Sequence, residues 1–365
     1  MNPEPSFSTA ETARYSRHLR LPEIGLAGQQ RLKAARVLVV GCGGLGCPVL
    51  QYLAAAGVGT LGLLDFDTVD DSNLQRQVLY ATADVGRPKA VVAAEKLAAQ
   101  NPFITLQTHE VLLSATNALA LFAGYDLVVD CSDNFATRYL VSDACVVLSR
   151  PLVFGAIFKF EGQVSVFNHQ SGPTYRCLYP QAPAPGEAPG CAEIGVLGVL
   201  PGLVGTLQAA EALKIILGLG EVLSGRLLLV DALAMRFETI RFRAVAANRQ
   251  RTALAPDYAA FCHEAPLVAA PAAPEIGADE LKAWQRSGRP LQLLDVREPA
   301  EYARRSIGGQ LIPLGQLAGR LAELAPDVPV VVHCASGARS QQAARLLAAR
   351  GYAAVYSLRG GLADY

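Results

Sequence analysis

A cysteine near the C-terminus stands between a strand-like run and a helix-like segment. Val328–His333 predicts a buried strand, Ser340–Arg350 predicts a helix, and Cys334 opens the short loop between them. The backbone N–H groups of such a loop converge on the sulfur, and the positive end of the helix favours a thiolate or persulfide. Arg339 follows Cys334 by five positions, one fewer than in the Cys-x5-Arg loops that enclose a phosphate. The smaller loop favours a cysteine that carries sulfur.

A glycine-rich turn near the N-terminus indicates a phosphate site. It follows the apolar run Arg36–Val40 and precedes a helix-like segment, Leu50–Ala56. Glycines let backbone N–H groups approach a phosphate at the positive end of a helix. The glycines of the turn are Gly41, Gly43, Gly44 and Gly46. Asp65, at the end of the next strand-like run, is placed to accept hydrogen bonds from a ribose. On these residues alone the default ligand is NAD or FAD, and an NAD-dependent oxidoreductase stays open.

Three polar residues beyond this strand change the expected ligand. Asn73, Arg76 and Lys89 add hydrogen-bond donors and two positive charges. A triphosphate with its metal ion needs such a clamp, whereas backbone groups usually hold the pyrophosphate of a dinucleotide. The chain has no P-loop motif. We therefore expect this site to bind ATP.

The elements that position these residues alternate between strand and helix. Strand-like runs at Arg36–Val40, Leu61–Asp65 and Asp126–Asp130 alternate with helix-like segments such as Lys89–Gln100. This order predicts an α/β fold with a Rossmann-like, mostly parallel sheet. Gly162–Phe167 alternates with period two, which predicts an antiparallel extension of that sheet.

Shifts in composition divide the chain into domains. We expect residues 1–243 to form the ATP-binding domain, the Ala- and Pro-rich residues 244–274 to form a linker, and residues 275–365 to form a smaller α/β domain. The Pro- and Gly-rich stretch Pro180–Gly190 predicts a loop or lid within the first domain.

Four motifs in the first domain resemble a known family. GCGGLG, LLDFDTVDDSNLQRQ, GRPKA and DCSDN, within Arg14–Phe242, resemble the ubiquitin-activating-enzyme-like adenylyltransferases of molybdopterin and thiamine biosynthesis. The resemblance implies an acyl adenylate formed on the C-terminal glycine of a small ubiquitin-like sulfur-carrier protein that ends in Gly-Gly. It also implies that ATP is held by Gly44, Asp65, Asn73, Arg76 and Lys89. Asp133, in Cys131-Ser-Asp-Asn134, would hold Mg²⁺ or the reacting phosphate.

The resemblance also extends to the N-terminus. Arg14-Tyr-Ser-Arg17 resembles the family's RYxRQ, although His18 replaces the Gln. It implies that Arg17 reaches the ATP of a partner subunit in a homodimer, like an arginine finger supplied in trans.

The C-terminal domain resembles the rhodanese family over about Gly277–Tyr365. The motifs are Leu294-Asp-Val-Arg-Glu-Pro-Ala-Glu-Tyr302, the Cys334 loop and Leu358-Arg-Gly-Gly-Leu362. The resemblance implies that Cys334 carries a persulfide, with a cysteine desulfurase or thiosulfate as sulfur donor, and that Asp295 and Arg297 are structural. An alternative is that this domain only docks a separate sulfur donor.

Two other groups of cysteines bear on the chemistry. In fused relatives the cysteine that matches Cys191 attacks the acyl adenylate or pairs with the incoming sulfur, which makes Cys191 a second catalytic candidate. Many relatives carry a structural zinc on two Cys-x-x-Cys pairs. Here Thr174 replaces the first cysteine of the pair that ends at Cys177, and near Cys262 and His263 there is one cysteine and no pair. Tetrahedral sites need all four ligands, so we expect no zinc.

Composition sets limits on partners and compartment. The chain of 365 residues is 51% hydrophobic, with a formal net charge of zero, so it can bury sizeable cores and offers no general attraction to nucleic acid or an anionic membrane. Val196–Gly220 is strongly apolar but contains Gln208 and Glu211, which favours a buried helix over a membrane span. The N-terminus has no apolar signal region, and the eight scattered cysteines suggest the reducing cytoplasm.

Overall fold

The computed structural model describes residues 7–183, 195–258, 262, 273–317 and 319–365. The chain divides into two compact units, Met1–Pro266 and Leu267–Tyr365. This division falls inside the segment 244–274 that the sequence predicts as a linker. Residues 246–249 of that segment form a short 3-10 helix, η3 (Ala246–Arg249), that belongs to the first unit.

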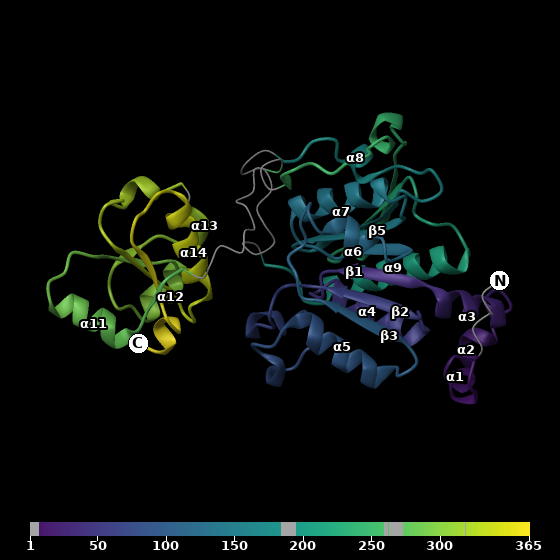
Figure 1. Ribbon diagram of the computed structural model, residues 1–365, viewed down its shortest axis with the longest axis horizontal. Coiled ribbons are helices and arrows are strands. Elements are labelled where there is room, and N and C mark those ends of the chain that lie inside the picture. Colours follow the sequence, from purple (N-terminus) through teal and green to yellow (C-terminus); the bar gives the residue numbers. More distant parts are fainter. Residues whose placement is uncertain (1–6, 184–194, 259–261, 263–272, 318) are drawn as a thin grey trace. The chain divides into compact units, whose positions relative to one another are not determined.

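The first unit is built on an eight-stranded sheet in the order β3-β2-β1-β4-β5-β6-β7-β8 (Figure 1). The pairs from β3 to β5 are parallel, and those from β5 to β8 are antiparallel, which confirms the predicted antiparallel extension. The strands are β1 (Arg36–Val40), β2 (Thr60–Leu64), β3 (Thr105–His109), β4 (Leu127–Asp130), β5 (Leu152–Phe158), β6 (Glu161–Phe167), β7 (Arg226–Asp231) and β8 (Arg236–Arg241).

Helices cover both faces of this sheet (Figure 1). Side chains alternate across each strand, so Val37 and Val39 pack into one buried core while Leu38 and Val40 pack into the other. The helices are α1 (Thr9–Arg14), α2 (Ser16–Leu19), α3 (Gly25–Ala34), α4 (Gly46–Ala56), α5 (Lys89–Gln100), α6 (Ala118–Phe122), α7 (Phe135–Val147), α8 (Tyr175–Leu178) and α9 (Leu200–Leu217), with the 3-10 turns η1 (Asp71–Asn73) and η2 (Thr82–Asp84).

Helix α9 is the apolar stretch that the sequence predicts as a buried helix. It is long and apolar enough to cross a membrane by length and composition alone. In the structure it packs against α4, β5 and β6. Leu200, Val204 and Ala212 belong to the core, and Gln208 is fully buried within it. The helix is therefore part of the core of the first unit.

The second unit has a five-stranded parallel sheet in the order β11-β10-β12-β13-β9. Its strands are β9 (Glu275–Ile276), β10 (Gln292–Asp295), β11 (Gln310–Leu311), β12 (Val330–His333) and β13 (Val355–Leu358). Its helices are α11 (Ala278–Arg286), α12 (Pro299–Arg304), α13 (Leu314–Leu317) and α14 (Ala338–Ala349), with the 3-10 turns η4 (Leu321–Glu323) and η5 (Gly361–Ala363). Val330 and Val332 face one core and Val331 the other. The predicted α/β class is confirmed for both units.

Candidate functional site

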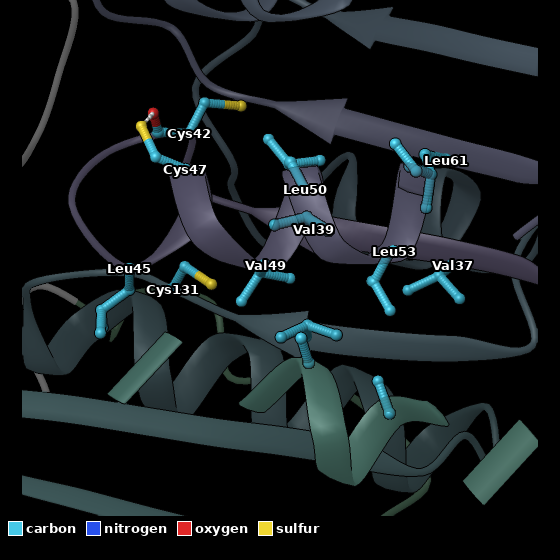
Figure 2. Close-up of a cluster of buried hydrophobic side chains, with 14 of the residues drawn as sticks. Val37, Val39, Cys42, Leu45, Cys47, Val49, Leu50, Leu53, Leu61 and Cys131 are labelled. Atoms are coloured by element: carbon cyan, nitrogen blue, oxygen red, sulfur yellow. Dashed lines mark hydrogen bonds between the residues drawn. The ribbon is translucent and has the colours of Figure 1, made fainter. Parts of the chain in front are cut away.

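The glycine turn joins β1 to α4 at the carboxyl end of the parallel strands. Gly41 has φ of +93°, and a Cβ there would lie 2.8 Å from the Cys131 carbonyl oxygen. A Cβ on Gly46 would clash with the carbonyl oxygen of Gly41. Both positions therefore require glycine. Figure 2 shows the turn, with Leu45 and Cys47 at the start of α4. The glycines therefore let a phosphate approach the backbone N–H groups at the N-terminus of α4, where negative charge is favoured.

Asp65 fixes the turn to the end of β2. Its Oδ2 accepts a hydrogen bond from the Cys42 N–H at 2.8 Å, and its Oδ1 accepts one from the Asp67 N–H at 2.8 Å. Burial raises the pKa of the Asp65 carboxyl, and the charge of Lys89 opposes that shift. The sequence assigned Asp65 to a ribose; the structure shows that it also holds the turn itself.

Lys89 is a buried cation at the first position of α5. Its side chain is 8% exposed, and Nζ lies 3.1 Å from Asp67 Oδ2. Burial lowers the pKa of Lys89, but the negative charges of Asp65, Asp67 and Asp133 outweigh burial and the net pKa is raised. The ammonium group therefore stays charged.

Arg76 and Asn73 follow β2 in the segment that crosses the glycine turn. A Cβ on Gly44 would lie 3.7 Å from Arg76 Cγ, so the stem of Arg76 passes beside the turn. Arg76 Nη1 donates to the Ser72 carbonyl at 3.0 Å. Asn73 ends η1, and its Oδ1 accepts from the Asp70 N–H at 3.4 Å. Arg76 is only partly buried, so its guanidinium is accessible to a ligand.

Asp133 is exposed in the loop between β4 and α7. Asn134 caps α7, since its Oδ1 accepts from the Thr137 N–H at 2.8 Å. The Asn134 Nδ2 donates to Asp133 Oδ1 at 3.4 Å. An exposed carboxylate at a strand end is suited to a hard cation such as Mg²⁺.

Two residues of this region were missed by the sequence reasoning. Asp130, at the end of β4, is 1% exposed, and burial raises the pKa of its carboxyl. Gln77 lies against Gly43, where an added Cβ would be 3.4 Å from Nε2. Within the described residues, Asp130 Oδ2 and Gln77 Oε1 are buried without a hydrogen-bond partner. Both belong to the quoted motifs, but their burial depends on distant packing and is not visible in a local pattern.

Arg17 lies away from the glycine turn of its own chain. The neighbouring Tyr15 packs on Gly57, where an added Cβ would meet the Tyr15 ring at 2.6 Å. Gly57 follows the C-terminus of α4, whereas the glycine turn precedes its N-terminus. A helix of 11 residues is about 16 Å long at 1.5 Å per residue. Arg17 is exposed on α2, so the structure does not bring it to the other site residues within one chain.

The N-terminus of α9 meets the same turn. A Cβ on Gly44 would lie 3.0 Å from Pro201 Cβ, and a Cβ on Gly198 would meet Gln75. The segment that enters α9 is therefore held beside the neighbours of Arg76. Cys191 lies seven positions before Gly198 and falls outside the described residues.

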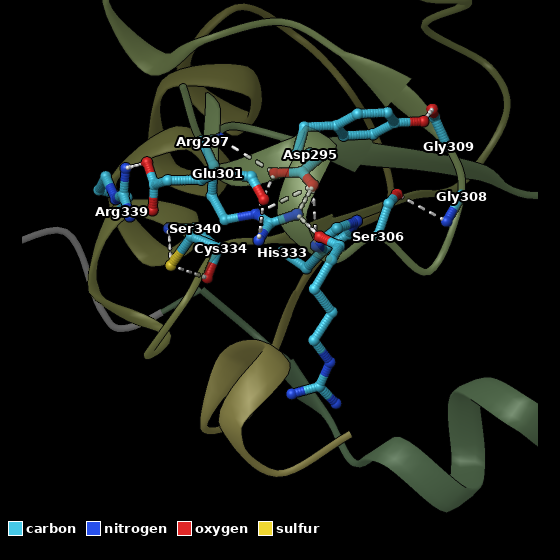
Figure 3. Close-up of polar contacts among 12 residues, drawn as sticks. Asp295, Arg297, Glu301, Ser306, Gly308, Gly309, His333, Cys334, Arg339 and Ser340 are labelled. Carbon is cyan, nitrogen blue, oxygen red and sulfur yellow. Dashed lines mark hydrogen bonds and ion pairs between the residues drawn. The ribbon is translucent and has the colours of Figure 1, made fainter. Parts of the chain in front are cut away.

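Cys334 sits at the centre of the second site, at the end of β12 (Figure 3). Its sulfur accepts hydrogen bonds from the N–H groups of Gly337 at 3.2 Å and Ser340 at 3.4 Å. Gly337 has φ of +96°, which turns the loop back over the sulfur. The Leu362 N–H donates to the Cys334 carbonyl at 2.8 Å, so the Gly-Gly segment near the C-terminus braces the loop. This is the N–H cradle that the sequence predicts.

Two arginine–carboxylate pairs flank the Cys334 loop (Figure 3). Arg297 Nη2 lies 2.6 Å from Asp295 Oδ2, and Nε also bonds this buried carboxylate. Arg339 donates through Nη1 and Nη2 to both oxygens of Glu301, at 2.8 and 2.7 Å. The Arg339 hydrogen bonds lower the pKa of Glu301 to about 2. The Asp295–Arg297 pair is buried and fixes the fold behind the loop. The Glu301–Arg339 pair lies beside the loop at the surface.

Cys177 is held by hydrogen bonds at the position where relatives were expected to carry zinc. Its sulfur accepts from the N–H groups of Val245 at 3.2 Å and Thr174 at 3.4 Å, and from Asn248 Nδ2 at 3.8 Å. The sequence located the second half of this site near Cys262 and His263. The Cys177 sulfur contacts Val245 and Asn248, while His263 falls outside the described residues. In the described ranges, no group of three or more His, Cys, Asp or Glu is arranged to hold a metal ion.

The two sites can be compared with known proteins. Residues 15–252 match the model of the ThiF family, and residues 277–365 match that of the rhodanese-like domain. The chain belongs to the ThiF family. The expected combination of a ThiF-type adenylyltransferase with a C-terminal rhodanese domain is confirmed. The ThiF assignment also removes the reason to prefer the NAD-dependent oxidoreductase that the glycine turn alone left open.

Two of three relatives within the ThiF family cover more than nine tenths of this chain, and the third covers 70% of it. A protein of Mycobacterium tuberculosis named probable adenylyltransferase/sulfurtransferase MoeZ is 48% identical over 99% of this chain and 94% of its own length. Adenylyltransferase and sulfurtransferase MOCS3 of Mus musculus is 44% identical over 94% of this chain and 82% of its length. Sulfur carrier protein adenylyltransferase of Thermus thermophilus is 54% identical over 70% of this chain and 98% of its length.

Solved structures support the ThiF fold. Escherichia coli MccB with ATP has a TM-score of 0.56 and 22% identity, over 64% of this chain and 72% of MccB. MccB with MccA-N7isoASN has a TM-score of 0.57 at 22% identity, over 67% of this chain and 74% of MccB. At this identity the likeness shows the fold alone.

Proposed function

We propose that the chain adenylates the C-terminal glycine of a ubiquitin-like sulfur-carrier protein and then transfers sulfur to it from a persulfide on Cys334. The observation that carries this proposal is the presence of two built sites in one chain. One is a glycine turn flanked by Lys89 and Arg76, and the other is an N–H cradle around the Cys334 sulfur. The relatives named as both adenylyltransferase and sulfurtransferase support the combination.

The first site suits ATP with Mg²⁺. The turn at Gly41–Gly46 has no room for side chains at Gly41 and Gly46 and presents backbone to a phosphate. Lys89 and Arg76 would balance the phosphate charge, and Asp65 and Asn73 would hold the nucleoside. Asp133 would hold Mg²⁺, which offsets negative charge on the phosphates when bound. The carrier's carboxylate oxygen attacks the α-phosphorus, the bond to the β-phosphate oxygen breaks, and pyrophosphate leaves.

The second site supplies the sulfur. The terminal sulfur of the Cys334 persulfide attacks the acyl carbon, and AMP leaves with the electron pair of the broken bond. This produces an acyl disulfide on Cys334. We assign Cys191 the role of resolving it: its thiolate attacks the Cys334 sulfur, the thiocarboxylate leaves, and a Cys191–Cys334 disulfide forms. A cellular dithiol then reduces that disulfide and restores both thiols.

The partners follow from this chemistry. They are a sulfur carrier ending in Gly-Gly, a cysteine desulfurase or thiosulfate as donor, and a second copy of the chain that supplies Arg17. We propose that the carriers include those of molybdenum cofactor and thiamine biosynthesis, and that the reaction takes place in the cytoplasm, where Cys334 stays reduced. We propose no zinc, since hydrogen bonds occupy the Cys177 sulfur; stoichiometric zinc in the purified protein would contradict this.

Two substitutions test the division of labour. Asp133→Ala should abolish ATP–pyrophosphate exchange that depends on the carrier. Cys334→Ala should leave that exchange intact and block formation of the thiocarboxylate, read from the mass of the carrier. Loss of both activities in Cys334→Ala would overturn the proposal. If neither thiosulfate nor a desulfurase adds sulfur to Cys334, the second domain only docks another sulfurtransferase.

A further inference from the structure

Glu301 neutralises Arg339, which lies in the first turn of the helix that follows the Cys334 loop. It stands on α12, outside the loop, and grips both terminal nitrogens of Arg339. The side chains of Arg339 and Glu301 are 36% and 34% exposed, so the pair lies at the surface, while Cys334 itself is 1% exposed. Arg339 directly precedes Ser340, whose N–H donates to the Cys334 sulfur at 3.4 Å, and the Glu301 hydrogen bonds raise the pKa of Arg339. An incoming sulfur donor therefore meets an Arg339 side chain whose positive charge is already balanced by Glu301.

Arg297 and Ser340, which also lie beside the cradle, are held by hydrogen bonds of their own. Arg297 is bound by Asp295 through Nε and Nη2 and by the Arg305 carbonyl at 2.7 Å. Ser340 Oγ bonds the Gly337 carbonyl and Ser357 Oγ, both at 2.8 Å. His333 is fully buried behind the loop, and burial lowers the pKa of its ring, so it adds no charge near neutral pH. Among the described residues, the two arginines that flank the Cys334 loop, Arg297 and Arg339, are thus both paired with carboxylates.

We propose that Glu301 is a specificity-determining residue that turns the site away from anionic sulfur donors and toward persulfides. This inference rests on the proposed sulfurtransferase role of Cys334. With thiosulfate, the Cys334 thiolate attacks the outer sulfur of a dianion and sulfite leaves with the electron pair of the S–S bond. With a persulfide, the thiolate attacks the outer sulfur of R–S–SH, and a thiolate RS⁻ leaves. The first reaction gathers three negative charges at the cradle and needs a free cation, whereas the second gathers fewer.

The test compares the two donors on the intact chain. Cys334 loading is followed by the mass of one added sulfur atom, with thiosulfate or cysteine persulfide, whose amino-acid part has no net charge, as donor. Glu301→Gln should free Arg339 and raise the second-order rate constant for thiosulfate roughly tenfold, with a steeper fall at high salt. Loading by the persulfide should stay within about twofold, because that reaction does not depend on the freed charge.

Three further variants separate specificity from structure. Glu301→Asp keeps the charge and should keep the wild-type ratio of the two rates. The double variant Glu301→Gln/Arg339→Gln should return the thiosulfate rate toward wild type, since the freed cation is gone. Glu323→Gln breaks a similar two-contact pair with Arg320 elsewhere in the unit and should change neither rate.

The outcomes distinguish this inference from the proposed function. An unchanged ratio in Glu301→Gln, or a parallel fall in both rates, means that Glu301 only supports the fold, and the specificity role is wrong. If neither donor loads the wild-type chain, the sulfurtransferase role of Cys334 fails first.

Discussion

The backbone N–H of Val245 donates a hydrogen bond to the Cys177 sulfur at 3.2 Å. This hydrogen bond joins α8 to the segment that follows β8. Thr174 stands three positions before Cys177, and Asn248 three positions after Val245, and both also bond this sulfur. Positions 174, 177, 245 and 248 have the spacing of two Cys-x-x-Cys pairs, but only position 177 is a cysteine. Hydrogen bonds to this sulfur thus connect the two segments.

Removing this sulfur should loosen the connection. Burial acts to raise the pKa of Cys177, but hydrogen bonds from Thr174 and Val245 outweigh it and the pKa is lowered. Cys177→Ala should lower the free energy of unfolding by about 1 kcal/mol, the net value of a typical hydrogen bond. Cys177→Ser keeps an acceptor and should lose less. Urea unfolding measures both, and equal losses would show that packing, not hydrogen bonding, is what the sulfur contributes.

Asp143 provides a second connection to the same segment. Its buried carboxylate on α7 accepts from Arg176 at 2.8 and 2.9 Å and from the Tyr258 hydroxyl at 2.8 Å, and Arg251 lies 3.2 Å away. Asp143→Ala should destabilise the first unit by roughly 3–5 kcal/mol, because Arg176 would be left buried without its counter-ion. The matched control is Glu221→Gln, which breaks an exposed pair with Arg226 and should cost less than about 1 kcal/mol. Denaturant midpoints of the two variants check this, and similar values for both would contradict the role of burial.

The sequence predicted the features that local chemistry determines. The turn at Gly41–Gly46 and the loop after Cys334 are each set by a strand, a few small residues and a helix, so their geometry follows from a short motif. The contacts of Cys177 with Val245 and Asn248 were not predicted, because neither residue carries metal-ligand chemistry in its own sequence. The hydrogen bonds of Asp143 were not predicted either, because its partners come from α8 and from residues 251–258, more than 30 positions away.

Lys89 should be needed for adenylation itself. It is the buried cation of the first site, and its raised pKa keeps it charged through neutral and mildly alkaline pH. Lys89→Met should lower carrier-dependent ATP–pyrophosphate exchange by roughly a hundredfold or more. Lys96→Met is the control, because Lys96 lies on the same helix but pairs with Asp84 rather than with Asp67. Comparable losses in both variants would show a defect of α5 rather than of the site.

Arg17 should act on the site of the partner subunit. Because Tyr15, which directly precedes α2, packs on Gly57 at the far end of α4 from the glycine turn, an adenylation role for Arg17 requires a second chain. Arg17→Ala and Lys89→Met should each be inactive alone. After mixing and subunit exchange they should regain roughly a quarter of wild-type exchange activity, since half of the dimers are mixed and each has one complete site. Lys89→Met mixed with Asp133→Ala should recover nothing, because both residues act within one chain. Failure of the first mixture to recover means that Arg17 does not act in trans.

The Glu301–Arg339 pair should make the second unit sensitive to acid. The pKa of Glu301 is lowered from 4.5 to about 2, chiefly by the Arg339 hydrogen bonds. A carboxylate whose pKa is lower in the folded state contributes stability above its unfolded pKa and loses it as pH falls through the folded pKa. The contribution should therefore be complete above pH 4.5 and decline toward pH 2. The difference in melting temperature between wild type and Glu301→Gln should shrink across this window, as measured by thermal unfolding. The contribution of the pair to stability is modest because about a third of each side chain is exposed. A difference in melting temperature that stays constant from pH 5 to pH 2 would show that the Glu301–Arg339 pair does not cause the acid sensitivity.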